Sequence, residues 1–180
     1  MMTLAQLSVT VGVVIIAFGV PLVLVPGGTR RLLTAFPRNR MAGAILAAAA
    51  LVWSAWEVNE MALGGIDAFK PLLWVIGPVL FALVVVYMDD LLAVRALGGL
   101  LMLVAGPMLD IQRFHPSHWR WVLAVLAYAW AIKGAVLILA PFRFRHGVEW
   151  AFKTDTACRG LGAAAAGFGM FLIGLGLTVF

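Results

Sequence analysis

Lys133 is the side chain whose position in this 180-residue chain most needs an explanation. It lies within the apolar run from Trp119 to Ala140, eight residues before Pro141. A lysine near the centre of a membrane helix costs about 2.5–3.5 kcal/mol on insertion scales, so an ion pair or water is expected beside it. One interpretation places Lys133 in an ion or proton path. The alternative is a structural lysine that extends to the headgroups or binds the carbonyl groups of a neighbouring helix.

Further charged residues lie where the apolar runs end. Asp89 and Asp90 separate two runs, and Arg95 follows five residues after Asp90, where it can pair with an aspartate across the turn. These three residues are candidates for the cytoplasmic end of an ion path. Glu57 and Asp110 end two other runs and are candidates for its outer end.

The pattern R-x-x-G occurs at Arg40, Arg95 and Arg159, and each time it opens a long apolar run. A cation at a helix N-terminus opposes the helix dipole, so local helix physics does not explain these arginines. Guanidinium groups bind lipid phosphates bidentately, and we interpret the arginines as topology markers, with a ligand or partner role as the alternative. The glycine is expected to let the returning helix pack closely. The same lipid contact is expected of Arg30, Arg31, Arg38, Arg143 and Arg145.

The segment His115-Pro-Ser-His118 places two imidazoles near Asp110. Imidazole and carboxylate together suit zinc or another divalent ion. The two histidines lie in a loop, however, and no second motif fixes a geometry, so a solvated outer surface is the simpler interpretation. Cys158 is the single cysteine, no histidine lies within an apolar run, and no nucleotide-binding, nucleophile-elbow or HExxH motif occurs. The sequence therefore predicts no cofactor and specifies no reaction.

The composition indicates that a lipid bilayer surrounds most of the chain. Hydrophobic residues make up 64% and charged residues 12%, whereas soluble domains carry about 25% charge. The net charge of +5 would suggest nucleic acid in a soluble protein. Here the basic residues lie in short loops beside apolar runs, so we expect anionic lipid headgroups as the partner and no nucleic acid.

The elements that position these residues are six apolar runs, each near the length of about 20 residues that spans a bilayer. They predict an all-α bundle of six transmembrane helices in a single membrane domain, 1–180, built from three hairpins near 7–60, 70–109 and 119–180. The basic segment 141–159 has Arg145, Glu149 and Lys153 at helical spacing, with Val148 on another face. It predicts a short helix on the membrane surface.

The first and third hairpins share an apolar helix closed by proline, a basic loop and R-x-x-G, which favours duplication over chance. This hairpin resembles short bacterial inner-membrane proteins of uncharacterised function. The resemblance departs in the middle hairpin, where Asp89-Asp90 replaces the basic loop. It implies a small membrane hairpin and nothing about activity.

Loop charges predict the orientation. Nine Lys and Arg residues lie on one side of the six spans and three on the other, which places the first side in the cytoplasm. Both termini are then outside the cytoplasm, in a bacterial inner membrane. No basic residue precedes the first apolar run, so a secretory signal peptide is not expected.

Three functions are compatible with these observations. The first is an accessory or assembly subunit, or a homo-oligomeric structural membrane protein, which acts through helix packing with a membrane-protein partner. The second is a small ion or solute channel or transporter that uses Lys133 and the acidic residues at the helix ends. The third is an interfacial enzyme at His115 and His118. The near absence of polar residues in the apolar runs favours the first.

Overall fold

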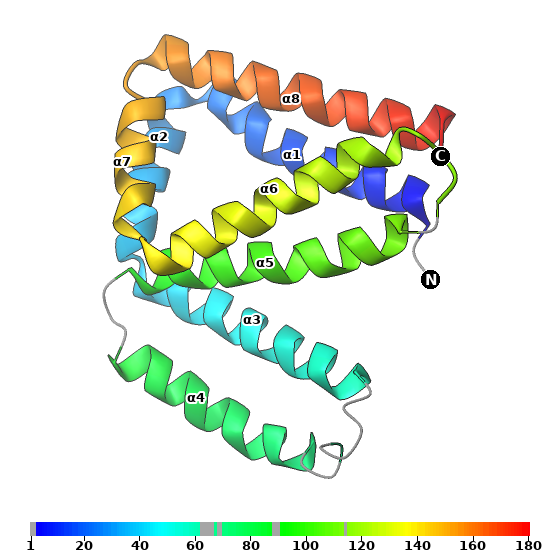
Figure 1. Cartoon of the computed structure of the whole chain (residues 1–180). Coiled ribbons are helices and arrows are strands. Elements are labelled where there is room, and N and C mark those ends of the chain that lie inside the picture. The colour runs from blue at the N-terminus through cyan, green and yellow to red at the C-terminus, as the bar shows by residue number, and fades with distance from the viewer. Residues whose placement is uncertain (1–2, 62–66, 68–69, 88–90, 114) are drawn as a thin grey trace. The chain divides into compact units, whose positions relative to one another are not determined.

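The computed structural model describes residues 3–61, 67, 70–87, 91–113 and 115–180. Every regular element in these residues is helical. The α-helices are α1 (Leu4–Leu24), α2 (Pro26–Ala35), α3 (Arg40–Glu60), α4 (Leu73–Tyr87), α5 (Leu92–Gln112), α6 (Arg120–Leu139), α7 (Phe142–Ala151) and α8 (Asp155–Thr178), and a short 3-10 helix, Phe36–Arg38, follows α2 (Figure 1).

Five of the described helices, α1, α3, α5, α6 and α8, are long and apolar enough to cross a membrane. The chain is therefore all-α, and these helices indicate a multi-pass membrane protein. Helix α4 is apolar but has only 15 residues. The expected count of six spans is thus not confirmed by helix length. Asp89 and Asp90, in the connection after α4, lie outside the described residues.

The chain forms two compact units. Unit 1 comprises Met1–Ala35, Val104–Trp130 and Arg145–Phe180, and unit 2 comprises Phe36–Leu103 and Ala131–Phe144. Helices α5 and α6 each contribute one part to unit 1 and one part to unit 2. Each unit is described by itself below.

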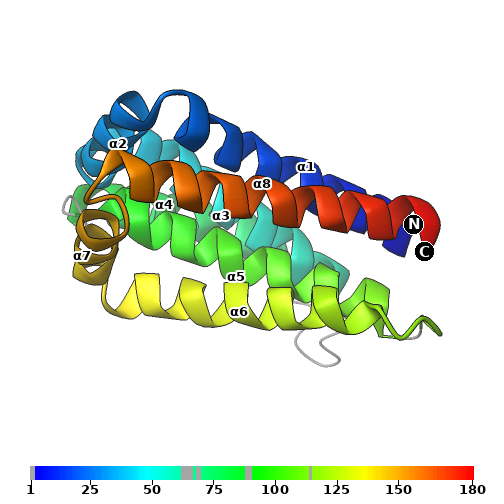
Figure 2. The same cartoon turned by 90° about the horizontal axis from the view of Figure 1, so that it is seen from above.

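In unit 1, α1 and α8 pack against each other in antiparallel directions (Figures 1 and 2). A Cβ atom added to Gly12 or to Gly169 would lie 2.6 Å from the carbonyl oxygen of the other glycine. Gly19 and Gly162 approach in the same way, at 2.8 and 2.7 Å. The glycines are seven residues apart in each helix and so lie on one face, where small residues let two backbones come close.

A hydrogen bond joins these two helices, and capping groups satisfy the first turn of each. The buried hydroxyl of Ser8 donates a hydrogen bond of 2.6 Å to the carbonyl oxygen of Leu172 on α8. Thr3 and Gln6 form a capping box at the start of α1, and Thr154 caps α8. Capping groups satisfy backbone N–H groups that the first helical turn leaves free.

A basic loop is expected after the first apolar helix. Most of the segment 26–40 instead forms the short helix α2. Pro26 opens this helix, a position where proline is favoured since its missing N–H is not needed there. The hydroxyl of Thr29 donates to the carbonyl oxygens of Pro21 and Val25 at 3.0 and 2.9 Å. The short helix predicted in 141–159 is confirmed as α7, whose Val148 is buried, and its position on the membrane surface stays a prediction.

In unit 2, α5 and α6 approach closely at Gly98 and Gly134. A Cβ atom on either residue would lie 2.7 or 2.5 Å from the other's carbonyl oxygen. At the start of α3, a Cβ atom on Gly43 would lie 2.9 Å from the backbone nitrogen of Ala93 on α5. With Gly162, all three glycines of the R-x-x-G patterns are in close contact with another helix, which confirms their expected role.

The expected hairpins near 7–60, 70–109 and 119–180 would pair α1 with α3, α4 with α5, and α6 with α8. Phe81 and Val84 of α4 do pack against a cluster that includes Leu92 and Ala96 of α5. The described contacts also join α1 to α8, α3 to α4, and α5 to α6. These pairs cross the boundaries of the expected hairpins, because the small residues that permit close approach occur on several helices and the sequence does not say which of them meet.

Candidate functional site

Lys133 lies on the exposed side of α6. Its neighbour Ile132 is 66% exposed, and Val125 and Leu139 on the same helix are also exposed apolar residues. Lys133 makes no hydrogen bond or ion pair with any described residue. It lies six residues before the end of α6, or about 9 Å at ~1.5 Å per residue. Lys133 is therefore an exposed cation within a candidate membrane span.

The other described candidates for an ion path are Arg95, Glu57 and Asp110, and none of them forms a hydrogen bond or ion pair with Lys133. Arg95 is half-buried, and its Nε atom has no hydrogen-bond partner among the described residues. Glu57 accepts a hydrogen bond of 3.0 Å from the indole nitrogen of Trp53, one turn earlier on α3. Asp110 is exposed near the end of α5. None of the ion pairs in the described part of the chain joins Lys133 to a carboxylate.

The arginines predicted to contact lipid are all exposed: Arg30, Arg31, Arg38, Arg40, Arg143, Arg145 and Arg159. Two of them also make contacts within unit 1. The Arg30 guanidinium donates to the carbonyl oxygen of Lys153 at 3.4 Å, and Arg145 pairs with Glu149 at 3.1 Å. Exposure is compatible with contacts between these guanidinium groups and lipid phosphates, which remain a prediction.

The two histidines do not converge on a metal site. The Nδ1 atom of His115 accepts a hydrogen bond of 3.3 Å from the backbone N–H of Ser117, and its ring meets Phe180 edge-on. His118 is exposed. Within the described residues, no group of three or more potential metal-ligating side chains comes together. The His115 ring thus has a structural role in the turn between α5 and α6.

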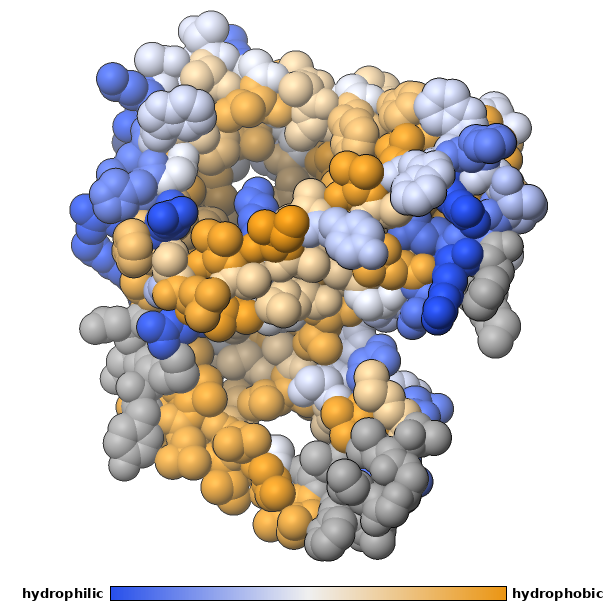
Figure 3. Space-filling model, viewed as in Figure 1, coloured by the Kyte–Doolittle hydropathy of each residue, from blue (hydrophilic) through white to orange (hydrophobic). Residues whose placement is uncertain are grey.

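A cavity of about 370 Å³ lies in unit 1, at the end of α5 and the start of α6. Its polar lining consists of Asp110, Gln112, Arg113, Arg120 and Tyr128, and Trp121 adds an indole ring. On the face seen in Figure 3, hydrophilic residues gather around this α5–α6 connection and over α7, whereas hydrophobic residues cover the middle of α6. The cavity therefore belongs to the polar end of two candidate spans.

Two residues of this cavity have informative contacts. Arg120 donates to the carbonyl oxygens of His115 at 2.7 Å and Arg113 at 3.4 Å, which holds the α5–α6 turn against the start of α6. Gln112 is only 4% exposed, and neither atom of its amide group has a hydrogen-bond partner among the described residues. Sequence reasoning identified Asp110 but missed Gln112, because one glutamine after an apolar run gives no sign of its burial.

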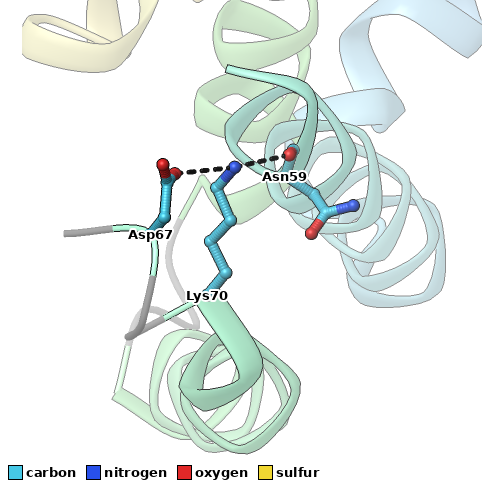
Figure 4. Close-up of polar contacts among 3 residues, drawn as sticks. All are labelled: Asn59, Asp67 and Lys70. Carbon is cyan, nitrogen blue, oxygen red and sulfur yellow. Dashed lines mark hydrogen bonds and ion pairs between the residues drawn. The ribbon is translucent and has the colours of Figure 1, made fainter. Parts of the chain in front are cut away.

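A second cavity, of about 430 Å³, lies in unit 2 between α3 and α4. Its lining is mostly apolar and includes Trp56, Trp74 and Phe81. At its polar end, Lys70 forms an ion pair of 2.9 Å with Asp67 and donates a hydrogen bond of 2.9 Å to the carbonyl oxygen of Asn59 (Figure 4). These contacts tie the start of α4 to the end of α3 and give Lys70 a structural role.

Comparisons with protein-family models, with curated proteins and with solved structures found no match for this chain.

Proposed function

We propose that this chain is an accessory or assembly subunit of a membrane complex, which binds a partner helix on the exposed face of α6 through Lys133. The observation that carries this proposal is the exposure of Lys133 between apolar side chains, without an ionic partner. Charged side chains within a membrane are costly, and they pair with another charge or with carbonyl groups. A carboxylate on a helix of another protein meets this requirement.

We propose a different protein as the partner, because Glu57 of a second copy of this chain is poorly placed to pair with Lys133. Within unit 2, Gly134 lies next to Lys133 and contacts Gly98, six residues into α5. Helix α3 starts at the same level as α5, since Gly43 contacts Ala93. Glu57 is seventeen residues into α3, near its far end. A second copy in the same orientation therefore presents Glu57 at another depth of the membrane.

The channel or transporter alternative required Lys133 to lie inside an ion path. An exposed Lys133 does not favour that alternative, and neither of the two cavities described above is lined by this residue. The enzyme alternative relied on His115 and His118, for which no third ligand is found among the described residues. Assembly is thus the function that the geometry supports best.

The proposed topology has six membrane crossings, with both termini outside the cytoplasm of a bacterial cell. Antiparallel packing of α1 and α8 supports an even number of crossings, because it places the two ends of the chain on one side. Five helices of spanning length make an odd number. We therefore propose α4, extended by the helical turn at residues 70–72, as the sixth crossing. The exposed basic residues of α2 and α7 then face the cytoplasmic headgroups.

The test is purification of the complex in mild detergent, followed by replacement of Lys133. In Lys133→Met the charge is lost, and we expect a stoichiometric partner to be lost from the purified complex. Lys133→Arg keeps the charge and retains the partner, and Lys153→Met removes an exposed lysine outside the spans as a matched control.

The identity of the contact is then tested by exchange of charges. A carboxylate in a membrane helix of the partner is replaced by lysine, and Lys133→Asp is made in this chain. We expect each single variant to dissociate the complex and the double variant to restore it. A complex that survives Lys133→Met at wild-type stoichiometry would refute the role given to this lysine.

A further inference from the structure

The cavity at the end of α5 and the start of α6 combines features of a ligand site that neither helix packing nor the proposed subunit role explains. Its volume of about 370 Å³ falls within the range of about 300–1,000 Å³ that is typical of small-molecule sites. All the residues that line it belong to unit 1. It lies where two candidate spans end, and so at the level of the lipid headgroups.

The side chains around the cavity carry charges of both signs. Asp110 supplies a carboxylate, and Arg113 and Arg120 supply guanidinium groups. A carboxylate binds an ammonium group, whereas a guanidinium binds a phosphate or carboxylate through paired hydrogen bonds. A ligand that satisfies both ends must itself carry a cation and an anion a few bonds apart. Such a ligand contacts both kinds of group at once, which a simple cation or a simple anion does not.

Gln112 provides an independent observation. Its side chain borders the cavity, is 4% exposed and has no partner for either its amide nitrogen or its amide oxygen among the described residues. Leaving a buried polar group without a partner costs about 1–3 kcal/mol. Rotation of the amide toward a polar occupant of the cavity would recover that cost. An occupant with both hydrogen-bond donors and acceptors matches the two atoms of the amide.

The lining changes in character along α6. Arg120 is at the first position of the helix, whereas Tyr128 lies eight residues further on, or about 12 Å deeper. Tyr128 and Trp121 are 58% and 63% exposed, so this side of the cavity is open toward the surroundings of the helix. Tyrosine and tryptophan are typical of the boundary between headgroups and acyl chains. The cavity thus has a charged end and an aromatic end.

We propose that this cavity binds an ammonium–phosphate zwitterion, with the ammonium group on Asp110, the phosphate on Arg113 and Arg120, and Gln112 bonded to polar atoms between them. The aromatic end favours the headgroup of a phospholipid as the source, with its glycerol and first acyl carbons beside Trp121 and Tyr128. A free phosphoethanolamine ester shares the same chemistry. This proposal does not depend on the subunit function assigned to Lys133.

The test measures thermal unfolding of the purified protein in detergent while lipid is added. Phosphatidylethanolamine is expected to raise the unfolding temperature more than phosphatidylglycerol, which lacks the ammonium group. In Asp110→Asn this difference between the two lipids disappears. Glu57→Gln removes a carboxylate near the end of another span and keeps the difference. Soluble glycerophosphoethanolamine forms a further arm: a shift equal to that of the lipid assigns the free ester, and a smaller shift assigns the lipid.

Gln112→Leu gives a second measurement. A variant that fails to fold could not produce the expected result, because that result is a raised unfolding temperature. Replacing an unpartnered buried amide with an apolar side chain of similar size is expected to raise the unfolding temperature of the lipid-free protein. The same variant should reduce the shift produced by phosphatidylethanolamine. The proposal is overturned by equal shifts with the two lipids in the wild type. It is equally overturned if the preference for phosphatidylethanolamine persists in Asp110→Asn.

Discussion

Individual residues carry the polar chemistry of this chain, and Lys133 illustrates how context decides their meaning. A lysine in an apolar helix is compatible with an ion path, a structural bond or a contact with another protein. Its exposure on α6 and its lack of a described partner are the observations on which the assembly proposal rests. The exposed charge should also lower the stability of the chain when it is purified alone.

Lys133→Leu should make the isolated chain more stable. The leucine removes a charge that costs about 2.5–3.5 kcal/mol near a helix centre, and no described intramolecular bond is lost. We expect a higher midpoint of thermal unfolding in detergent, with Lys133→Arg unchanged. A lower midpoint for Lys133→Leu would show that the lysine stabilises its own chain, contrary to the assembly proposal.

Ser8 provides the second prediction at this scale. Its buried hydroxyl bonds Leu172 across the α1–α8 pair, whereas the exposed Thr10 hydroxyl bonds Gln6 within its own helix. Ser8→Ala should lower the free energy of unfolding by about 0.5–1.5 kcal/mol, the typical net value of one hydrogen bond. Thr10→Ala is the matched control and should have a smaller effect in the same equilibrium measurement. Equal losses would mean that the interhelical bond contributes nothing specific.

At the scale of elements, glycine determines which helices come close. Gly169 and Gly167 are two residues apart in α8, yet only Gly169 faces α1. Gly169→Ala places a methyl group 2.6 Å from a backbone oxygen, and overpacking of this kind costs about 1–3 kcal/mol. Gly167 has open space around it, so Gly167→Ala should be neutral or slightly stabilising. Thermal unfolding of the two variants compares them directly, and similar midpoints would contradict the close packing of α1 on α8.

The α5–α6 pair permits an even closer comparison. Gly98 contacts Gly134, whereas its neighbour Gly99 has no atom within 4 Å of an added Cβ. Gly98→Ala is expected to separate the two helices and lower the unfolding temperature, and Gly99→Ala is not. Thermal unfolding in detergent compares the two variants. Equal midpoints for Gly98→Ala and Gly99→Ala would contradict the close approach of α5 and α6.

At the scale of the whole molecule, the proposed arrangement across the membrane rests on charge and on the pairing of the first and last helices. Exposed arginines in α2 and α7 favour the cytoplasmic side for these helices. In this proposal, antiparallel α1 and α8 place both termini on the opposite side, and the α5–α6 connection shares that side because His115 contacts Phe180 in unit 1.

Cysteine labelling in intact cells tests this topology. In a Cys158→Ala background, Ser117→Cys should react with a membrane-impermeant maleimide, since it lies in the α5–α6 connection. Arg145→Cys on α7 should react only after the membrane is permeabilised. If α4 is the sixth crossing, Met61→Cys should react with the impermeant maleimide in intact cells, as Ser117→Cys does. Labelling of Met61→Cys and Ser117→Cys from opposite sides would show that α4 does not cross.

The sequence by itself determined the class of this protein, the positions of its long helices and the close-packing role of the R-x-x-G glycines. Hydropathy and helix-ending residues are local properties, and a bilayer imposes a fixed length on them. Only the tertiary structure decided which helices pair, that Lys133 is exposed, and that Gln112 is buried beside a cavity. The physical reason is that lipid is as apolar as the interior of a membrane protein. The pattern of apolar residues therefore marks a span but does not distinguish its inner face from its outer face.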